Sequence, residues 1–157
     1  MRAGRLLIVV LACVTLLSCA RKPAPVATYD RNHDGRIDEW LYTAGKGEYK
    51  IALDTNRDGR PDEVETLVNG QVVEIERDRN FDGRTDLVEK FDHGKIARVV
   101  RDDNFDGKPE TIEIYRDGKL AMVEHDPDGD GVAERTDYYN DNGKLIRSVV
   151  AKPVPTR

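Results

Sequence analysis

A nine-residue acidic motif recurs five times along this chain, each copy beginning 24 residues after the one before. The copies read DRNHDGRID, DTNRDGRPD, DRNFDGRTD, DDNFDGKPE and DPDGDGVAE, and they begin at Asp30, Asp54, Asp78, Asp102 and Asp126. A strict period of this length is typical of repeat proteins, in which each unit packs against its neighbours. We refer to each copy as an acidic loop and number its places from one to nine. The chain is therefore expected to fold as a row of five similar units.

A second turn signal lies between successive acidic loops. It is a glycine preceded by Asn, His or Asp, at Asn69-Gly70, His93-Gly94, Asp117-Gly118 and Asn142-Gly143, with the looser Ala44-Gly45-Lys46-Gly47 in the first repeat. Such pairs tolerate the positive φ angles that two-residue hairpin turns need. The segments between loops and turns are five to seven residues long, rich in β-branched residues and without a helical period. Each repeat therefore predicts an acidic loop, a strand, a tight turn and a second strand.

Five such repeats predict an all-β domain over residues 30–150, built as an antiparallel meander of about ten short strands. We expect an open twisted sheet; a closed barrel is the alternative that the sequence leaves open. Two apolar columns recur at the repeat period, and we expect both to form the core because hairpins bury alternate positions. The first column is Trp40, Val64, Val88 and Ile112, with Thr136 at the equivalent position of the fifth repeat. The second is Ile51, Ile75, Val99 and Val123.

The N-terminal residues have the pattern of a secretory signal peptide. Arg2 and Arg5 precede an apolar run over residues 6–17, which ends in Leu-Leu-Ser-Cys19. This ending resembles a bacterial lipobox, which implies cleavage after residue 18, lipidation of Cys19 and attachment to a membrane through the lipid. Because no aspartate follows Cys19, the resemblance implies an outer-membrane lipoprotein, facing either the periplasm or the cell surface. An ordinary signal peptide with an incidental cysteine is the alternative. Residues 19–29 would then form a lipidated tether and residues 151–157 a C-terminal tail.

The acidic loop has the oxygen-rich composition that calcium prefers. Its pattern is D-x-[ND]-x-D-G-x-x-[DE], with short oxygen-bearing side chains at places one, three and five, a glycine turn at place six and a carboxylate at place nine. With the main-chain carbonyl of place seven, these groups supply the six to eight oxygens that Ca²⁺ accepts. Mg²⁺ demands stricter octahedral geometry, and no thiolate or histidine cluster offers a site to zinc, iron or copper. The predicted cofactor is therefore Ca²⁺.

The predicted calcium ligands are places one, three, five, seven and nine of every loop. They are Asp30, Asn32, Asp34, Arg36 and Asp38; Asp54, Asn56, Asp58, Arg60 and Asp62; Asp78, Asn80, Asp82, Arg84 and Asp86; Asp102, Asn104, Asp106, Lys108 and Glu110; and Asp126, Asp128, Asp130, Val132 and Glu134. The alternative is a set of turns whose aspartates bind only main-chain amides. Four loops carry three acidic ligands and the fifth carries four, and such crowding of like charges is unfavourable without a counter-ion.

These residues resemble the calcium loops of EF-hands, dockerins and thrombospondin type 3 repeats, and the strand–loop–strand loops of integrin-type propeller repeats. In an EF-hand, place twelve holds the bidentate glutamate; here it holds Glu65, Glu89, Glu113 and Asp137, with Leu41 in the first repeat. A 24-residue period leaves no room for two helices, so we expect place nine to close each site and the place-twelve acids to form a solvated strand face. The whole chain resembles bacterial lipoproteins with tandem DxDxDG-type repeats and no assigned function, a resemblance that implies no activity.

The composition bears on which functions are plausible. The net charge of −5 argues against a nucleic-acid partner, because nucleic-acid binding normally needs a basic stripe. No catalytic constellation is evident, and we expect a non-enzymatic calcium-binding lipoprotein with a structural or interaction role. One alternative is a glycan- or envelope-binding module that uses Trp40, Tyr42, Tyr115, Tyr138 and Tyr139; another is an acidic hairpin array that needs no metal. Phe81 and Phe105 share place four, where they either stack between loops or offer an apolar contact to a protein partner.

Overall fold

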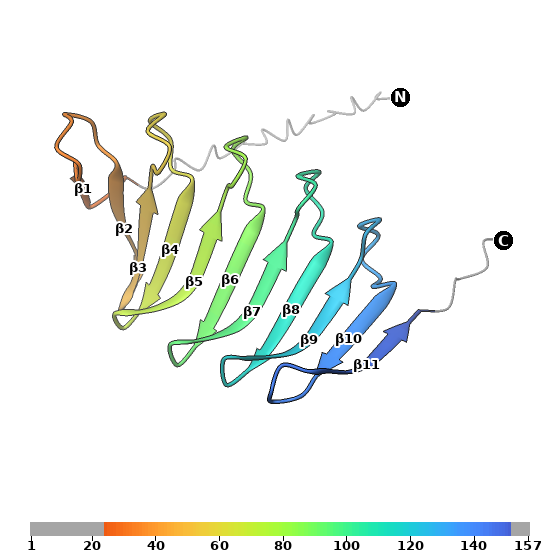
Figure 1. The fold of residues 1–157 in the computed structure, drawn as a ribbon. Coiled ribbons are helices and arrows are strands. Elements are labelled where there is room, and N and C mark those ends of the chain that lie inside the picture. Colours follow the sequence, from red (N-terminus) through yellow and green to blue (C-terminus); the bar gives the residue numbers. More distant parts are fainter. Residues whose placement is uncertain (1–23, 152–157) are drawn as a thin grey trace, which may run out of the picture.

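The computed structural model describes residues 24–151, which form one open antiparallel sheet (Figure 1). Within this range there are eleven strands, each paired with its neighbours in chain order. They are β1 (Ala27–Tyr29), β2 (Glu39–Gly45), β3 (Glu48–Leu53), β4 (Glu63–Val68), β5 (Gln71–Arg77), β6 (Leu87–Asp92), β7 (Lys95–Arg101), β8 (Thr111–Arg116), β9 (Lys119–His125), β10 (Arg135–Tyr139) and β11 (Leu145–Val150). The predicted all-β meander is confirmed, and the sheet stays open.

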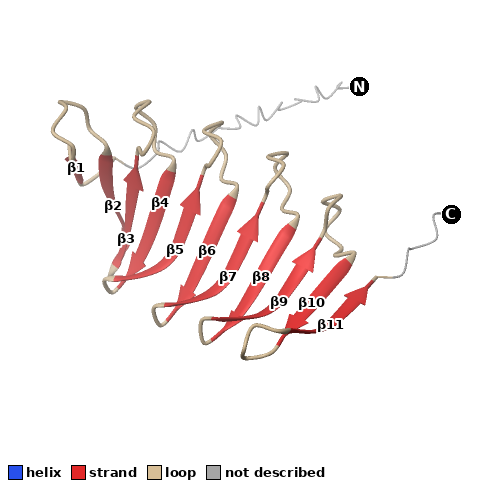
Figure 2. Cartoon of the chain, viewed as in Figure 1, coloured by secondary structure: helices blue, strands red, loops and turns tan. Residues whose placement is uncertain are grey.

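The described residues contain no helix (Figure 2). In this part of the chain, accordingly, no helical segment has the length and apolar character needed to cross a membrane. The predicted signal peptide over residues 1–18, Cys19 and residues 152–157 of the predicted tail lie outside the described residues. The eleventh strand is β1, which falls in the segment expected to be a tether. It pairs with β2, so the sheet begins at Ala27 and not at the first acidic loop.

The two kinds of turn lie at opposite ends of the strands. All acidic loops lie at one end of the strands and all tight turns at the other end (Figure 1). The tight turns have the expected chemistry: Asn69 and Gly70 have φ angles of 51° and 79°, and Asp117 and Gly118 have φ angles of 53° and 79°. Positive φ at both central residues matches the right-handed twist of the flanking strands. This alternation of turns brings the five acidic loops into one row.

The strand register places the two predicted columns on opposite faces. Trp40 lies opposite Ala52, and Ala52 opposite Val64, so one column runs across what we refer to as the Trp40 face. Val99 lies between Glu89 and Glu113 in the register, on what we refer to as the Val99 face. Both faces belong to a single layer, so burial is limited. Among the described apolar residues, only Ala52, Val99 and Val123 are buried.

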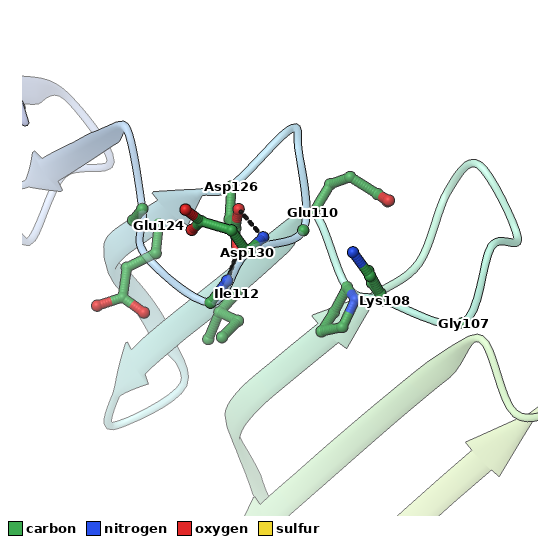
Figure 3. A pocket seen from close by; sticks show the side chains of 11 residues that line it. Gly107, Lys108, Glu110, Ile112, Glu124, Asp126 and Asp130 are labelled. Atoms are coloured by element: carbon green, nitrogen blue, oxygen red, sulfur yellow. Dashed lines mark hydrogen bonds between the residues drawn. The ribbon is translucent and has the colours of Figure 1, made fainter. Parts of the chain in front are cut away.

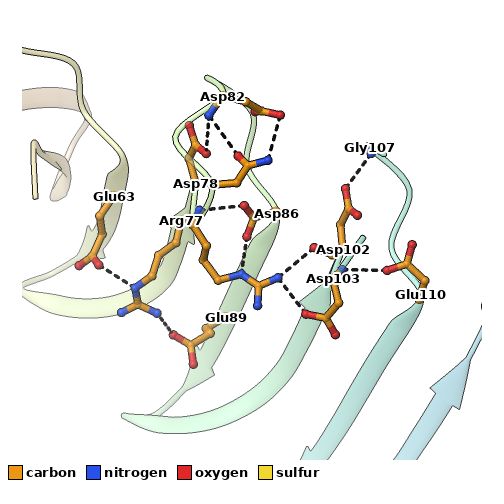
Figure 4. Close-up of polar contacts among 12 residues, drawn as sticks. Glu63, Arg77, Asp78, Asp82, Asp86, Glu89, Asp102, Asp103, Gly107 and Glu110 are labelled. Atoms are coloured by element: carbon orange, nitrogen blue, oxygen red, sulfur yellow. Dashed lines mark hydrogen bonds and ion pairs between the residues drawn. The ribbon is translucent and has the colours of Figure 1, made fainter. Parts of the chain in front are cut away.

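The place-twelve acids do not form the expected solvated face. They alternate with apolar residues across the Val99 face, where Asp137 is buried and Glu89 and Glu113 are half-buried. Arg77 lies between two acids, with its Nε 2.6 Å from Glu63 Oε2 and its Nη1 bonded to Glu89 (Figure 4). Burial acts to lower the pKa of Arg77, but the hydrogen bonds to Glu63 and Glu89 outweigh it and raise that pKa.

The same pairing recurs further along the Val99 face, where Arg101 Nε lies 3.2 Å from Glu113 Oε1. Glu113 also accepts a hydrogen bond of 2.5 Å from the Tyr115 hydroxyl. Burial, aided by this bond, raises the pKa of Tyr115 to about 12. Cross-strand pairs of this kind stabilise a sheet by about 0.2–1 kcal/mol each. The place-twelve acids thus join neighbouring strands in a layer that has little apolar core.

Candidate metal centres in the acidic loops

The first six places of each acidic loop fold in the same way. In the second loop, Asp54 accepts hydrogen bonds from the N–H groups of Asp58 and Gly59, at 3.2 and 2.8 Å. Asn56 Oδ1 also accepts from Asp58 N at 2.9 Å. Place six turns sharply in all five loops, with φ between 88° and 92° at Gly35, Gly59, Gly83, Gly107 and Gly131. Glycine is needed there because a side chain at such φ is strained.

Place four also has left-handed backbone geometry. Its φ angle is 60° at His33, 67° at Arg57, 62° at Phe81, 63° at Phe105 and 62° at Gly129. Four of these five residues carry a side chain, so the conformation is imposed by the surrounding loop and not by glycine. The sequence pattern did not reveal this, because place four is occupied by unrelated residue types.

Place seven has the same contact in every loop. Its main-chain N–H donates to the carboxylate of place five, at 2.8–2.9 Å. The residues concerned are Arg36, Arg60, Arg84, Lys108 and Val132. Their predicted role as ligands through the main-chain carbonyl stays a prediction.

Place nine divides the loops into two groups, of which the first has aspartate. In the second loop, Asp62 Oδ2 accepts from the N–H groups of Thr55 and Asn56, at 2.9 and 3.1 Å. In the third, Asp86 accepts from Arg79 N at 2.7 Å and from Arg79 Nε at 2.5 Å. In the first, Asp38 accepts from the N–H groups of residues 31 and 32. In these three loops the place-nine carboxylate is already bonded to the start of its own loop.

The fourth and fifth loops have glutamate at place nine, and their carboxylates converge. Ligand oxygens of Asp102, Asp106 and Glu110 all lie within 4.8 Å of one another. The same holds for Asp126, Asp128, Asp130 and Glu134. Over residues 24–151 these are the two groups of three or more His, Cys, Asp or Glu side chains that come together in this way. The predicted ligands therefore converge most closely in the last two loops.

Both glutamates of place nine leave an oxygen buried without a partner. Glu110 Oε2 accepts from Asp103 N at 2.8 Å, but Glu110 Oε1 has no hydrogen-bond partner among the described residues. Glu134 Oε2 is likewise buried without a partner in this part of the chain. Because a buried, unpaired carboxylate oxygen is costly, each such atom needs a donor or a cation. The donor set fits a hard cation such as Ca²⁺.

A hollow of about 310 Å³ lies between the fourth and fifth loops (Figure 3). Lys108 and Glu110 line it from one loop and Asp126 and Asp130 from the other. The two loops also touch: a Cβ added to Gly129 would lie 2.8 Å from Lys108 Cδ. A side chain at place four of the fifth loop would therefore collide with the fourth loop, which accounts for the glycine there.

Arg79 joins the third loop to the fourth. Its Nη2 donates to the main-chain oxygen of Asp102 and to Asp103 Oδ1, both at 2.9 Å, and its guanidinium carbon lies 5.5 Å from the centre of the Phe105 ring. Hydrogen bonds to Asp86 and Asp103, against the effect of burial, raise the pKa of Arg79. The acids bound in this network can be followed in Figure 4. Phe105 therefore contacts Arg79 of the neighbouring loop, although it is 39% exposed, against 50% for Phe81.

A group of residues that the sequence did not connect lies on the Val99 face at the end of the sheet. Ser148 Oγ donates to Asp137 Oδ1 at 2.5 Å, and His125 Nε2 lies 3.1 Å from Asp137 Oδ2. The Ser148 hydrogen bond, followed by the charge of Arg135, lowers the pKa of Asp137. This is not the order of a catalytic triad, in which histidine accepts the serine proton. The Ser148–Asp137 hydrogen bond instead joins β11 to β10. The sequence could have revealed this group only through the strand register, which places Ser148 opposite Asp137.

The five aromatic residues considered for a binding platform do not gather. Trp40 and Tyr42 lie on β2, whereas Tyr138 lies on the same face but on β10. Tyr138 is covered by Arg147, whose guanidinium carbon lies 5.3 Å from the ring centre. By strand alternation, Tyr115 and Tyr139 point to the Val99 face. These aromatic side chains thus form no single surface.

Comparisons with known proteins do not identify the chain. No family model matches it, and no curated protein matches it. Among solved structures, the accessory secretory protein 1, 2 and 3 structure from Streptococcus pneumoniae has a TM-score of 0.42 at 14% identity, over 81% of this chain and 22% of the other. The pneumococcal O-GlcNAc transferase GtfA, in complex with UDP and GlcNAc, has a TM-score of 0.40 at 15% identity, over 67% of this chain and 23% of the other. The chain thus spans about a quarter of either protein, and neither identifies its function.

Proposed function

We propose that this chain is an exported, lipid-anchored protein whose acidic loops bind Ca²⁺, with a structural or interaction role and no enzymatic activity. The observation that carries the calcium proposal is the pair of buried, unpartnered glutamate oxygens, Glu110 Oε1 and Glu134 Oε2. Each belongs to a group of carboxylates within 4.8 Å of one another. A divalent cation offsets both the repulsion among these carboxylates and the lost hydration of the buried oxygen.

The fifth loop is the strongest candidate. It brings four carboxylates together, whereas the fourth brings three and adds the amide of Asn104. Asp126 Oδ2 and Asp130 Oδ1 are held by the main-chain N–H groups of Gly131 and Val132, both at 2.8 Å. These bonds orient the carboxylates before a cation binds. We therefore propose that the fourth and fifth loops bind Ca²⁺ more tightly than the first three.

The first three loops need a larger rearrangement. Asp62 and Asp86 are buried and bonded to main-chain N–H groups, and each also accepts from a side chain of place two. A cation at these loops competes with those donors for the place-nine carboxylate. Their sites remain part of the proposal, at weaker affinity. Extracellular calcium modules commonly bind with Kd of about 10⁻⁴–10⁻³ M.

The role that follows is stabilisation of the loop edge of the sheet. The described sheet has one layer and little buried apolar surface, so its loops contribute strongly to its rigidity. A ligand that binds only the folded state stabilises it by RT ln(1 + [L]/Kd), which is about 0.4–1.4 kcal/mol per site at about 1 mM Ca²⁺ for that range of Kd. The proposal of a lipid anchor at Cys19 is based on the sequence alone, since that residue lies outside the described range. Export would expose the loops to millimolar calcium outside the cytoplasm.

Thermal unfolding of residues 20–157 tests the calcium proposal. We expect the midpoint to be higher in excess Ca²⁺ than in chelator, and Asp130→Asn to reduce the difference. Asp141→Asn is the matched control, because it makes the same charge change at an exposed residue outside the loops. A midpoint that is equal in calcium and chelator would reject calcium binding and favour the metal-independent array.

A further inference from the structure

The two edges of the sheet differ in length and in exposure. The first edge is β1, which has three residues, whereas the last is β11, which has six. Large exposed apolar side chains gather on β11: Leu145, Ile146 and Val150 are 47%, 63% and 70% exposed. Natural sheets usually blunt a free edge with a short strand, a charge or a proline. The β1 edge is blunted by its length, but β11 is a long apolar edge.

Among residues 24–151, no strand pairs with the outer edge of β11. Ala151 N donates to the main-chain oxygen of Glu134 at 2.8 Å, so residue 151 faces β10. In an antiparallel ladder the N–H and C=O of a residue point to one side, and successive residues alternate. Ser148 and Val150 therefore direct their N–H and C=O groups away from β10, whereas the register slips by one residue at Ile146. These two residues offer main-chain hydrogen bonds to another strand.

The polar side chains of β11 do not guard this edge. Arg147 is the one charged residue in the strand, and its guanidinium carbon lies 5.3 Å from the centre of the Tyr138 ring on β10. Ser148 Oγ donates to Asp137 Oδ1, also on β10. Both side chains are thus turned back onto the sheet. The usual electrostatic protection of an edge strand is missing from β11.

We propose that β11 is a dimer interface through which two copies of this chain join into one continuous sheet. The strands run antiparallel about a two-fold axis, with Ser148 of one copy opposite Ser148 of the second copy. Ile146 then lies opposite Val150 of the second copy, and the two Ser148 residues exchange N–H···O bonds. Arg147 lies opposite Val149 of the second copy. This register brings the exposed apolar residues Ile146 and Val150 together and places no arginine opposite another.

Both structural constraints select this register. Residues that pair must share a face, and they must direct their hydrogen-bonding groups toward the partner. Ser148 and Val150 meet both conditions at once because they alternate together, and centring the axis on Ser148 pairs more of β11 than centring it on Val150 does. If the two-fold axis passed through Arg147 instead, the arginines of the two copies would lie opposite each other. If it passed through Val149, the residues at the axis would have main-chain groups that already face β10.

A second copy fits this edge better than the other available strands. An antiparallel partner related by a two-fold axis has its acidic loops at the opposite end of the strands, so the like-charged loops of the two copies stay apart. The β1 edge offers a three-residue strand and hence fewer bonds. Residues beyond β11 include Pro153 and Pro155, which have no N–H to donate to a ladder.

Sedimentation analysis of residues 20–157, in calcium and in chelator, tests the proposal. We expect a dimer whose proportion rises with protein concentration. Val150→Pro removes an N–H that faces the open edge and leaves the β10 ladder intact, and Ile146→Lys places a charge on that edge; both are expected to give a monomer. Val26→Lys, at a valine beside β1 that is 58% exposed, is the control and is expected to stay dimeric.

Chemical crosslinking locates the interface. The chain has two cysteines, both before residue 20, so Ser148→Cys gives a single thiol in residues 20–157. We expect a short bismaleimide to crosslink two Ser148→Cys chains but not two Thr28→Cys chains, whose cysteine lies on β1. A monomer at about 100 μM, a dimer that persists in both edge variants, or crosslinking through Thr28→Cys alone would overturn the proposal.

Discussion

The guanidinium of Arg79 lies over the ring of Phe105, 5.5 Å from its centre, and so joins two consecutive acidic loops. The same guanidinium donates to the main-chain oxygen of Asp102. Neither residue resembles a calcium ligand, but together they set the spacing between the third and fourth loops. The loops are therefore coupled by side-chain packing as well as by the sheet beneath them.

We expect Phe105→Leu to destabilise the protein by about 0.5–1 kcal/mol, because it removes the ring on which Arg79 lies. Phe81→Leu is the matched control: it occupies the same place in the preceding loop with the same left-handed backbone, and its side chain is 50% exposed. Urea unfolding in chelator measures both. Equal losses in the two variants would show that the Arg79 contact contributes nothing.

The two kinds of place-nine residue should respond oppositely to substitution. In chelator, Asp86→Ala should destabilise the protein by about 1–3 kcal/mol, because it leaves the Arg79 main-chain N–H without its acceptor. Glu134→Ala should be neutral or stabilising in chelator, because it removes a buried oxygen that lacks a partner. In excess calcium, Glu134→Ala should lose more stability than it does in chelator. Urea unfolding of both variants under both conditions checks this; a loss for Glu134→Ala that is the same with and without calcium would contradict it.

The place-six glycines should tolerate no side chain. Gly83 has a φ angle of 92°, and an added Cβ would meet no atom within 4 Å, so backbone strain is the main cost of a substitution there. We expect Gly83→Ala to destabilise the protein by about 1–2 kcal/mol. Thr85→Ala, an exposed position in the same loop, should change stability by less than about 0.5 kcal/mol. Thermal unfolding compares the two, and a small loss at Gly83 would argue against a fixed loop.

One ion pair on the Trp40 face should make stability depend on pH. Lys90 Nζ lies 2.8 Å from Glu74 Oε2, and this hydrogen bond lowers the pKa of Glu74. A lowered carboxyl pKa stabilises the fold above its unfolded value of about 4.3, and the contribution is lost as the pH falls through the folded value. Lys90→Met should therefore cost about 0.2–1 kcal/mol at pH 7 and less near pH 3. A pH-independent difference in urea unfolding would show that the pair is not responsible.

The 24-residue period and the Asn-Gly and Asp-Gly turns were sufficient to predict the meander, because each signal acts within its own hairpin. β1 was missed because no acidic loop or turn pair precedes it. The place-twelve acids were placed in solvent because their partners depend on register: Glu89 meets Arg77 from a neighbouring strand. Alternation along one strand does not reveal such a partner.

Within the loops, the sequence predicted which residues supply oxygen but not which loops bring these oxygens together. The difference between Asp86 and Glu110 is one methylene group, and the pattern treats the two residues as equivalent. In the structure both side chains bond to the main-chain N–H of place two, but only the longer one also comes within reach of the other carboxylates of its loop. Such a difference depends on side-chain reach against a fixed backbone, which spacing alone does not encode.

Calcium binding to residues 20–157, measured by isothermal titration calorimetry, tests the central proposal most directly. We expect saturable binding with Kd of about 10⁻⁴–10⁻³ M for the tightest sites. The double variant Glu110→Gln and Glu134→Gln should lose those sites while remaining folded in chelator. Saturable binding that the double variant retains in full would contradict the assignment to the last two loops. No saturable binding up to about 10 mM Ca²⁺, well above that range, would contradict calcium binding itself.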